Sequence, residues 1–324
     1  MGHDRGVMRI RVVVPEDQRA TLLQYLRDEP AVCHLVESSA VSEKPSGSVV
    51  EFDIPLESAN PIISELKRFD LDDVGSITAA RLDVVVSAAA DRAKREVPGD
   101  ESQAVVWAEV SARTQAESRP TVSFFALMVL AVLIAAIGIL TDSPILIVGA
   151  MVVGPEFGPM SNVAYGLHRR RPDRVRQGVL TLIVGFGLGI GAAFLATAAL
   201  SSVGRIPQAY EFGARPLTSF ISHPDLFSAI VAVLAGVAGT VSLVEAKSNA
   251  LVGVFISVTT VPAAANVGVA LAMGQPDEAR GALVQLLLNV TCIVLVAAVT
   301  MTIARSAWHR VRDRQIRRHL PDRR

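Results

Sequence analysis

A glutamate and four other polar side chains stand in two apolar stretches that are otherwise suited to a membrane. The first stretch contains GAMVVGPEFGPM and the second contains GVFISVTTVPAAAN. A charged side chain facing lipid there would cost roughly 3 kcal/mol or more, so Glu156 is expected to face the protein interior. A buried carboxyl of this kind suits proton exchange or cation binding. The candidate residues for binding a solute or ion are Glu156, Asn162, Thr259, Thr260 and Asn266.

Glycine and proline interrupt both stretches. Proline removes a backbone N–H donor and clashes with the preceding turn, and glycine permits the altered backbone. The freed backbone groups cannot face lipid, so a broken helix must be buried in protein or line a hydrated cavity. The candidate helix breaks are Gly154, Pro155, Gly158, Pro159 and Pro262. In the alternative interpretation the prolines are structural kinks, and Glu156 only caps backbone amides near them.

The composition predicts a protein with several membrane spans. Hydrophobic residues make up 51% of the 324 residues and charged residues only 19%, an excess of apolar residues too large for a soluble protein. We count six segments long enough to cross a bilayer. They are residues 121–140, 145–167, 178–203, 225–244, 249–273 and 280–304.

Arginine in the short connections predicts how these spans are oriented. Residues 168–176 carry five arginines and the tail from residue 304 carries eight, whereas residues 141–144 and 274–279 carry acids and no base. Positively charged connections stay on the cytoplasmic side. We therefore expect a multi-pass protein of the cytoplasmic (inner) membrane with both termini in the cytoplasm. The arginine-rich loop and tail are expected to contact anionic lipids rather than nucleic acid.

The N-terminal part predicts a separate soluble domain. In residues 1–90, apolar–polar alternation indicates strands and helical spacing of apolar residues indicates helices. Their order is β-α-β-β-α-β, which is typical of a ferredoxin-like sandwich. Residues 91–119 are expected to form a charged linker and an interfacial helix, or an ordinary solvated helix. The six-span membrane domain then covers residues 120–304, and a basic cytoplasmic tail covers residues 305–324.

The membrane part contains an internal repeat with an offset of 104 residues. At this offset Asn162-Val163 matches Asn266-Val267, and the pattern PDxxR at 172–176 matches 276–280. The repeats cover residues 121–203 and 225–304. Each unit holds an odd number of spans, so the second copy enters the membrane from the opposite side. Inverted repeats of this kind place their binding site near the midplane, where broken helices of the two halves meet.

The stretches VGAMVVGPEFGPMSNVAYGL and LVGVFISVTTVPAAANVGVAL resemble the bacterial and archaeal domain-of-unknown-function 389 family of integral membrane proteins. The resemblance covers residues from about 120 to 304. It implies a membrane location and a helical architecture and carries no established substrate. The sequence departs from the common pattern in having a single Pro262 where relatives often have two prolines. It also has Glu156 where many relatives have an apolar residue.

Two classes of function fit these features. The first is a transporter or channel for a small solute or ion, with its site between the broken second and fifth spans. The alternative is a membrane-anchored sensor or oligomeric scaffold whose cytoplasmic domain binds a ligand or partner. We expect no enzymatic activity, because the spans lack an HExxH zinc motif, paired aspartates and a central histidine. We expect no cofactor or metal, and we expect a homo-oligomer.

Overall fold

The computed structural model describes residues 6–82, 84–96, 107–207, 210, 226–244 and 260–319 of the chain. The chain divides into two compact units, one formed by Met1–Glu109 with Ser306–Arg324 and the other by Val110–Arg305. Each unit buries its own set of hydrophobic side chains.

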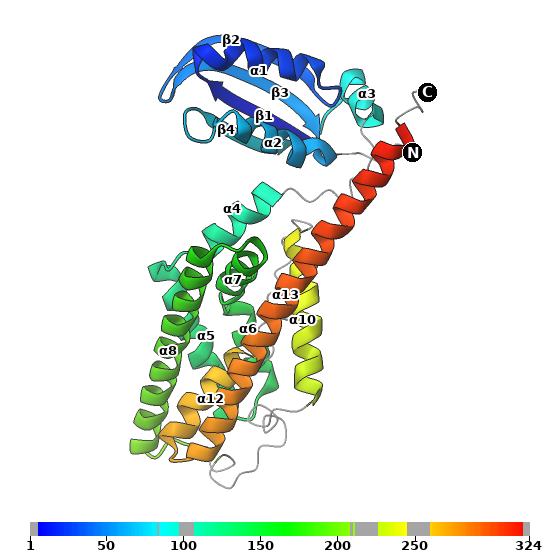
Figure 1. The fold of residues 1–324 in the computed structure, drawn as a ribbon. Coiled ribbons are helices and arrows are strands. Elements are labelled where there is room, and N and C mark those ends of the chain that lie inside the picture. Colours follow the sequence, from blue (N-terminus) through cyan, green and yellow to red (C-terminus); the bar gives the residue numbers. More distant parts are fainter. Residues whose placement is uncertain are drawn as a thin grey trace. The chain divides into compact units, whose positions relative to one another are not determined.

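The first unit contains a four-stranded antiparallel sheet (Figure 1). Its strands are β1 (Val7–Val14), β2 (Cys33–Glu43), β3 (Ser46–Pro55) and β4 (Ser76–Leu82), and they lie in the order β2-β3-β1-β4. Helix α1 (Glu16–Asp28) follows β1, and the short helix η1 (Leu56–Ser58) and α2 (Ala59–Arg68) follow β3. The β-α-β-β-α-β order predicted from the sequence is therefore present, with the strand order of a ferredoxin-like sandwich.

Alternation along β1 divides the two faces of the sheet. Met8, Ile10 and Val12 point to the face covered by the helices, where they join the core. The helices contribute to this core at helical spacing, through Leu22, Leu23 and Leu26 of α1 and Ile62, Ile63 and Leu66 of α2. The amphipathic pattern of the sequence is thus the direct cause of this packing.

Helix α3 (Ala88–Glu96) covers part of the opposite face of the sheet. Its Ala90 and Ala93 are buried against Val7 and Cys33. Residues 91–96, which we predicted to be charged linker, are therefore helical. The small alanine side chains let α3 approach the sheet, while Asp91, Arg92, Arg95 and Glu96 are exposed and Lys94 is buried.

A chain of hydrogen bonds ties α3 to the sheet. Asp53 is only 1% exposed and receives two hydrogen bonds from Arg9, of 2.8 and 3.1 Å. His34 Nδ1 lies 2.9 Å from Asp53 Oδ2, and its Nε2 lies 2.6 Å from Ser87 Oγ. Ser87 Oγ also accepts a hydrogen bond from the N–H of Ala89 in the first turn of α3. Burial favours a raised pKa for Asp53, but Arg9 and His34 outweigh it and lower this pKa below its ordinary value.

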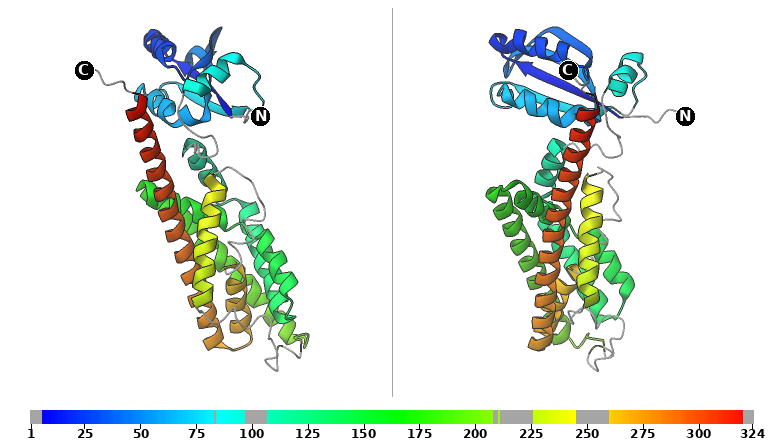
Figure 2. Two further views of the ribbon diagram at one scale, coloured as in Figure 1. Left: turned by 90° about the vertical axis from the view of Figure 1, so that its right-hand side faces the viewer. Right: turned by 45° about the vertical axis from the view of Figure 1, so that its right-hand side comes forward.

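The second unit is helical (Figures 1 and 2). Its elements begin with α4 (Trp107–Glu117), whose first residues belong to the other unit, and continue to α13, whose last residues also do. Between them lie α5 (Val122–Leu140), α6 (Pro144–Val153), α7 (Phe157–Arg169), α8 (Pro172–Ser202), α10 (Leu226–Val244) and α12 (Val261–Ala272); α13 covers Pro276–His319. Helix α12 packs against α5, α6 and α8, so a helix of the second half of the repeat contacts three helices of the first half.

Three described helices are long and apolar enough to cross a membrane: Val122–Leu140, Pro172–Ser202 and Pro276–Arg305. The pair Pro144–Val153 and Phe157–Arg169 passes the same test as one span bent by 56°. Shorter apolar helices cover Ser228–Leu243 and Val261–Ala272. Residues 249–259 of the predicted fifth span lie outside the described residues. The described part of the chain thus supports a membrane protein with three such helices, or four with the bent pair.

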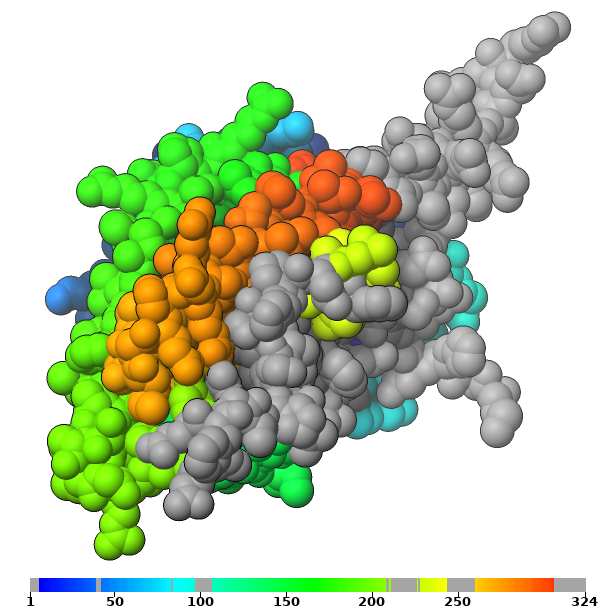
Figure 3. All heavy atoms as spheres, turned by 90° about the horizontal axis from the view of Figure 1, so that it is seen from below, coloured from blue at the N-terminus to red at the C-terminus, as the bar shows by residue number. Residues whose placement is uncertain are grey.

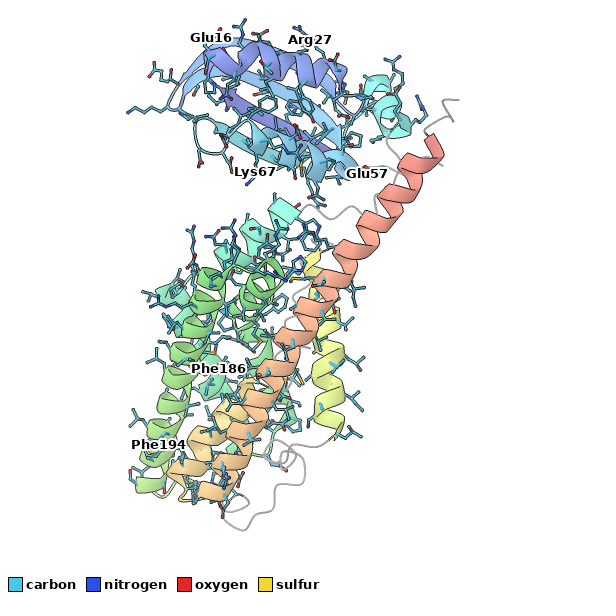
Figure 4. All side chains as sticks on the ribbon, viewed as in Figure 1. Glu16, Arg27, Glu57, Lys67, Phe186 and Phe194 are labelled. Carbon is cyan, nitrogen blue, oxygen red and sulfur yellow. The ribbon has the colours of Figure 1, made fainter. Side chains whose placement is uncertain are left out.

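Helix α8 has one face that packs on α5 and one face that is exposed. Phe186 is buried and Phe194 is partly exposed, and both are labelled on this helix in Figure 4. A Cβ atom at Gly185 or Gly189 would meet side chains of α5, whereas nothing lies within 4 Å of such an atom at Gly187 or Gly191. Gly185 and Gly189 therefore allow α8 to pack closely on α5, whereas Gly187 and Gly191 lie on the open side of α8. The outer face exposes large apolar side chains, including Ile183 and Leu195.

The Asp53 network predicts a pH-dependent stability for the sandwich. In the fragment 1–96, Asp53→Asn should lower the free energy of unfolding at neutral pH by about 2 kcal/mol, because the ion pair with Arg9 is lost and an NH2 donor replaces one of the two acceptor oxygens. The folded-state pKa of Asp53 is lowered, so the wild-type advantage is full above the ordinary aspartate pKa. It should disappear as the pH falls through the folded-state pKa.

Urea unfolding of both fragments at several pH values measures this difference. Glu65→Gln, at a surface carboxylate paired with exposed Arg68, is the matched control and should change stability little. A gap between wild type and Asp53→Asn that persists unchanged into strong acid would contradict the assignment.

Candidate functional site

The second predicted span breaks between α6 and α7. Helix α6 ends at Val153, and α7 begins at Phe157 at an angle of 56°. Gly154 and Pro155 occupy the break, and Glu156 is the N-cap residue of α7. Gly158 and Pro159 lie in the first turn of α7, where a proline has no intrahelical hydrogen bond to lose.

Glu156 contacts the corresponding point of the second half. Thr260 is the N-cap residue of α12, and its Oγ1 donates a hydrogen bond of 3.0 Å to Glu156 Oε1. Both residues are 0% exposed. Among the described residues, neither side chain forms a capping hydrogen bond with its own helix. The described hydrogen bond of Glu156 therefore joins the start of α7 to the start of α12.

Two pairs of helices begin at equivalent positions of the two halves. An offset of 104 residues carries the starts of α7 and α8 onto the starts of α12 and α13. The connection after α7 also recurs: Arg170 and Gly274 both have positive φ, at 54° and 69°. The N–H of Arg171 donates to the carbonyl of Gly166 at 2.8 Å, and that of Gln275 donates to the carbonyl of Ala270 at 2.8 Å. Local backbone geometry thus follows the sequence repeat.

The two connections lie at opposite ends of the helical unit. Figure 1 shows α8 and α13 starting from opposite ends, so the α7–α8 and α12–α13 connections are far apart. Seen from below in Figure 3, the C-terminal end of α8 and the α12–α13 connection share the same end of this unit. Glu156 and Thr260 are remote in sequence from both connections, at the opposite ends of α7 and α12.

The two predicted asparagines form hydrogen bonds with the helices that follow these connections, and their described bonds are not with Glu156. Asn162 Nδ2 donates to Ser118 Oγ at 3.1 Å and to the Arg174 carbonyl at 3.4 Å. Asn266 Nδ2 donates to Glu278 Oε1 at 3.1 Å. Each asparagine thus bonds a residue twelve positions later, in the first turn of the following long helix. Their described role is to hold the short helix against the long one.

The remaining predicted residues have different outcomes. Pro262 is the second residue of α12, which begins at Val261. The residues that precede Thr260 in the predicted fifth span lie outside the described residues, so the predicted break there stays a prediction. Thr259 lies outside the described residues. The structure therefore brings together one pair from the predicted site, Glu156 with Thr260, and assigns the two asparagines to separate contacts.

Sequence reasoning missed polar residues on the long helices. Gln285 and Asn289 are buried on α13, at 3% and 0% exposure, and are spaced so that they share one helical face. Thr181 of α8, the repeat equivalent of Gln285, is also buried. The spacing of Gln285 and Asn289 within an apolar segment was the available signal. Among the described residues no group of three His, Cys, Asp or Glu side chains could hold a metal ion.

These features define the class of protein: a mostly helical protein with three described helices long and apolar enough to span a membrane, a bent helix pair that could form a fourth span, and a small antiparallel α+β domain before them. The model of the family described as "Domain of unknown function (DUF389)" matches residues 151–295. This match confirms the resemblance identified from the two motif-bearing stretches, and it contains Glu156, Thr260 and both asparagines.

The chain is also similar to "Uncharacterized protein MJ0678" of Methanocaldococcus jannaschii, with 29% identity over 175 residues. The alignment covers 53% of this chain and 51% of that relative, so the chain spans about half the length of the relative. No solved structure matches the chain significantly.

Gly154 and Gly149 provide a matched pair of substitutions for the break. A Cβ atom at Gly154 would collide with Glu156 Oε2, whereas nothing lies within 4 Å of one at Gly149 in α6. Gly154→Ala should therefore displace the carboxyl group and destabilise the protein by about 1–3 kcal/mol. Gly149→Ala should be neutral or stabilise α6 by about 0.5–1 kcal/mol. Thermal unfolding in detergent measures both, and equal midpoints for the two variants would refute this geometry.

Proposed function

We propose that the protein is a transporter or channel for a small solute or ion, with its site where α7 and α12 begin. The hydrogen bond between Glu156 and Thr260 is the observation that carries this proposal. It places a fully buried carboxyl group at the meeting point of two short apolar helices from different halves of the chain. Charged groups inside membrane segments are costly, and a pathway for ions or protons is a common reason to retain one.

The proposed chemistry is uptake and release of a proton or cation by the Glu156 carboxylate. The Thr260 hydroxyl donates to one carboxylate oxygen in the described arrangement. When a proton or cation binds the carboxylate, this hydrogen bond weakens and α7 can separate from α12. Occupancy of the site would thus be linked to the contact between the two halves.

The proposal includes an inverted repeat of three spans in each half, giving six spans in all. The equivalent starts of α7 with α12 and of α8 with α13, and the recurring backbone bonds at the 104-residue offset, support the repeat. The α7–α8 and α12–α13 connections lie at opposite ends of the helical unit, which supports the inversion. With the arginine-rich connection at 168–176 in the cytoplasm, the protein would lie in the cytoplasmic membrane with both termini inside.

The proposed partners are anionic lipids at the arginine-rich loop and tail and further copies of this chain. Arg169, Arg170 and Arg171 are exposed, which suits contact with lipid headgroups better than a structural role. The proposed transport needs no cofactor and no enzymatic step. A sensor or scaffold in which the N-terminal sandwich binds a ligand remains the competing function, and transport by purified protein distinguishes the two.

Glu156→Gln tests the site directly. It keeps the size of the side chain and an oxygen that can accept from Thr260 but removes titration. In proteoliposomes under an imposed pH gradient, the wild type should change internal pH or drive uptake of a cation in a pH-dependent way. The glutamine variant should lose this pH dependence. Asp277→Asn, at an exposed carboxylate in the first turn of α13, should behave as wild type. A correctly folded Glu156→Gln protein with an unchanged pH profile would exclude the proposed role.

The repeat equivalents Asp173 and Asp277 test the inversion. Both are exposed, and each follows the proline that begins a long helix. In a cysteine-free background, Asp173→Cys should be protected from an impermeant maleimide in intact cells, whereas Asp277→Cys should react. Permeabilised cells give the maximum labelling of each site. Labelling of both, or of neither, from outside the cell would rule out the inverted arrangement.

A further inference from the structure

Arg174, in the first turn of α8, is bonded extensively to helix α4. Its guanidinium donates to the Ser111 carbonyl at 3.0 Å, to Ser111 Oγ at 2.8 Å and to Gln115 Oε1 at 3.2 Å. A longer bond of 3.4 Å reaches Thr114 Oγ1, which is buried. A planar guanidinium can serve several acceptors at fixed angles, which the ammonium group of lysine cannot do. Arg174 therefore holds α4 against α8 through several directional hydrogen bonds.

The same guanidinium holds α7. It lies 5.0 Å from the centre of the Tyr165 ring and 3.4 Å from Asn162 Oδ1. Asn162 in turn donates to the Arg174 carbonyl and to Ser118 Oγ, directly after the end of α4. Three helices, α4, α7 and α8, thus meet through one arginine and one asparagine.

A second contact places α4 beside the start of α7. A Cβ atom at Gly158 would lie 2.5 Å from the carbonyl oxygen of Glu117, so the end of α4 packs directly on the backbone there. Gly158 is two residues from Glu156. Helix α4 therefore contacts α7 both near the buried carboxyl group and near the connection to α8.

The second half of the repeat has different chemistry at the equivalent point. Glu278 occupies the position of Arg174, and it accepts a hydrogen bond from Asn266 where Arg174 donates one to Asn162. An ionised carboxylate only accepts hydrogen bonds, so it cannot replace the guanidinium N–H donors that bind α4. The segment equivalent to α4, residues 211–221, lies outside the described residues.

We propose that Arg174 is a positioning residue that clamps α4 onto α7 and α8 and thereby controls the contact between Glu156 and Thr260. Helix α7 transmits the position of α4 to Glu156, because α7 runs without interruption from Phe157 to Arg169. In the chain, α4 stands between the N-terminal sandwich and the first long helix, so a change in that sandwich can act on the transport site through this clamp. The proposal deepens the proposed function and rests on it for its effect on transport.

The first test measures how well α7 is held in place, through the reactivity of a cysteine at position 161, and does not depend on transport. Ser161 of α7 is 2% exposed and precedes Asn162, so Ser161→Cys reports opening of this helix. In full-length protein lacking Cys33 and Cys292, Arg174→Gln should raise the rate of maleimide reaction at position 161 by about tenfold, as expected for loss of a charged hydrogen-bond network. Arg174→Lys should restore little of the protection. Arg176→Gln, which removes the same charge from an exposed arginine nearby, should change nothing.

Equal reaction rates in Arg174→Gln and Arg176→Gln would overturn the clamp. If Arg174→Gln does not fold, a disulfide supplies the second test. Ser118→Cys with Asn162→Cys joins two side chains that are in hydrogen-bond contact, and oxidation should link α4 to α7. Failure of this disulfide to form in the folded protein would also overturn the clamp.

Flux through the cross-linked protein tests the link to transport. Oxidation should reduce the pH-dependent flux in proteoliposomes by about tenfold or more if α4 must move, and a reducing agent should restore it. The single variant Ser118→Cys under the same oxidant is the control. Undiminished flux after complete cross-linking would refute the regulatory role of α4. Absence of flux in the reduced protein and in wild type would instead refute the proposed function, while the reaction rate at position 161 would still decide the clamp.

Discussion

The helical unit depends on one buried hydrogen bond, between Glu156 at the start of α7 and Thr260 at the start of α12. A buried carboxylate needs a donor within the protein. The Thr260 hydroxyl supplies this donor and joins the starts of the two helices. Helix α12 is buried along nearly its whole length against α5, α6 and α8, which shields this point. The long helices then provide the apolar surface that faces outward.

The repeat explains why the two helix starts can meet, whereas its sequence differences explain what the meeting point can do. A hydrogen bond between positions 104 residues apart joins the same structural position in each half. Two glutamates at these positions would repel each other in a medium of low dielectric constant, and two threonines would leave nothing to titrate. One glutamate and one threonine combine a donor with an acceptor. Divergence of the halves is therefore a physical requirement of this arrangement, and the swap of Arg174 for Glu278 extends the same asymmetry to the helix connections.

Periodicity predicted the sandwich well because each of its elements buries one face. Ile10 and Val12 of β1 and Leu22 and Leu26 of α1 reveal their faces by spacing alone, and these residues form the core. The break at Gly154 and Pro155 was also predictable, since both residues disfavour a continuous helix. Helix α3 was missed because its charged residues outnumber its apolar ones. Its position depends on Ala90 and Ala93, which are too small to mark a buried face, and on the His34–Ser87 contact, which joins residues 53 positions apart.

The candidate site shows where sequence reasoning stops. The polar residues of the two motifs were grouped because they share apolar segments, yet a helix of 12 or 13 residues is about 18–20 Å long and separates its ends widely. Asn162 and Asn266 lie about two turns beyond Glu156 and Thr260, so they contact the following helices and not the central pair. A repeat offset identifies equivalent positions but carries no information about which of them converge. Convergence follows from how the helices pack: α12 lies against α5, α6 and α8. Its start meets the start of α7, whereas the connections to α8 and α13 lie at opposite ends of the helical unit.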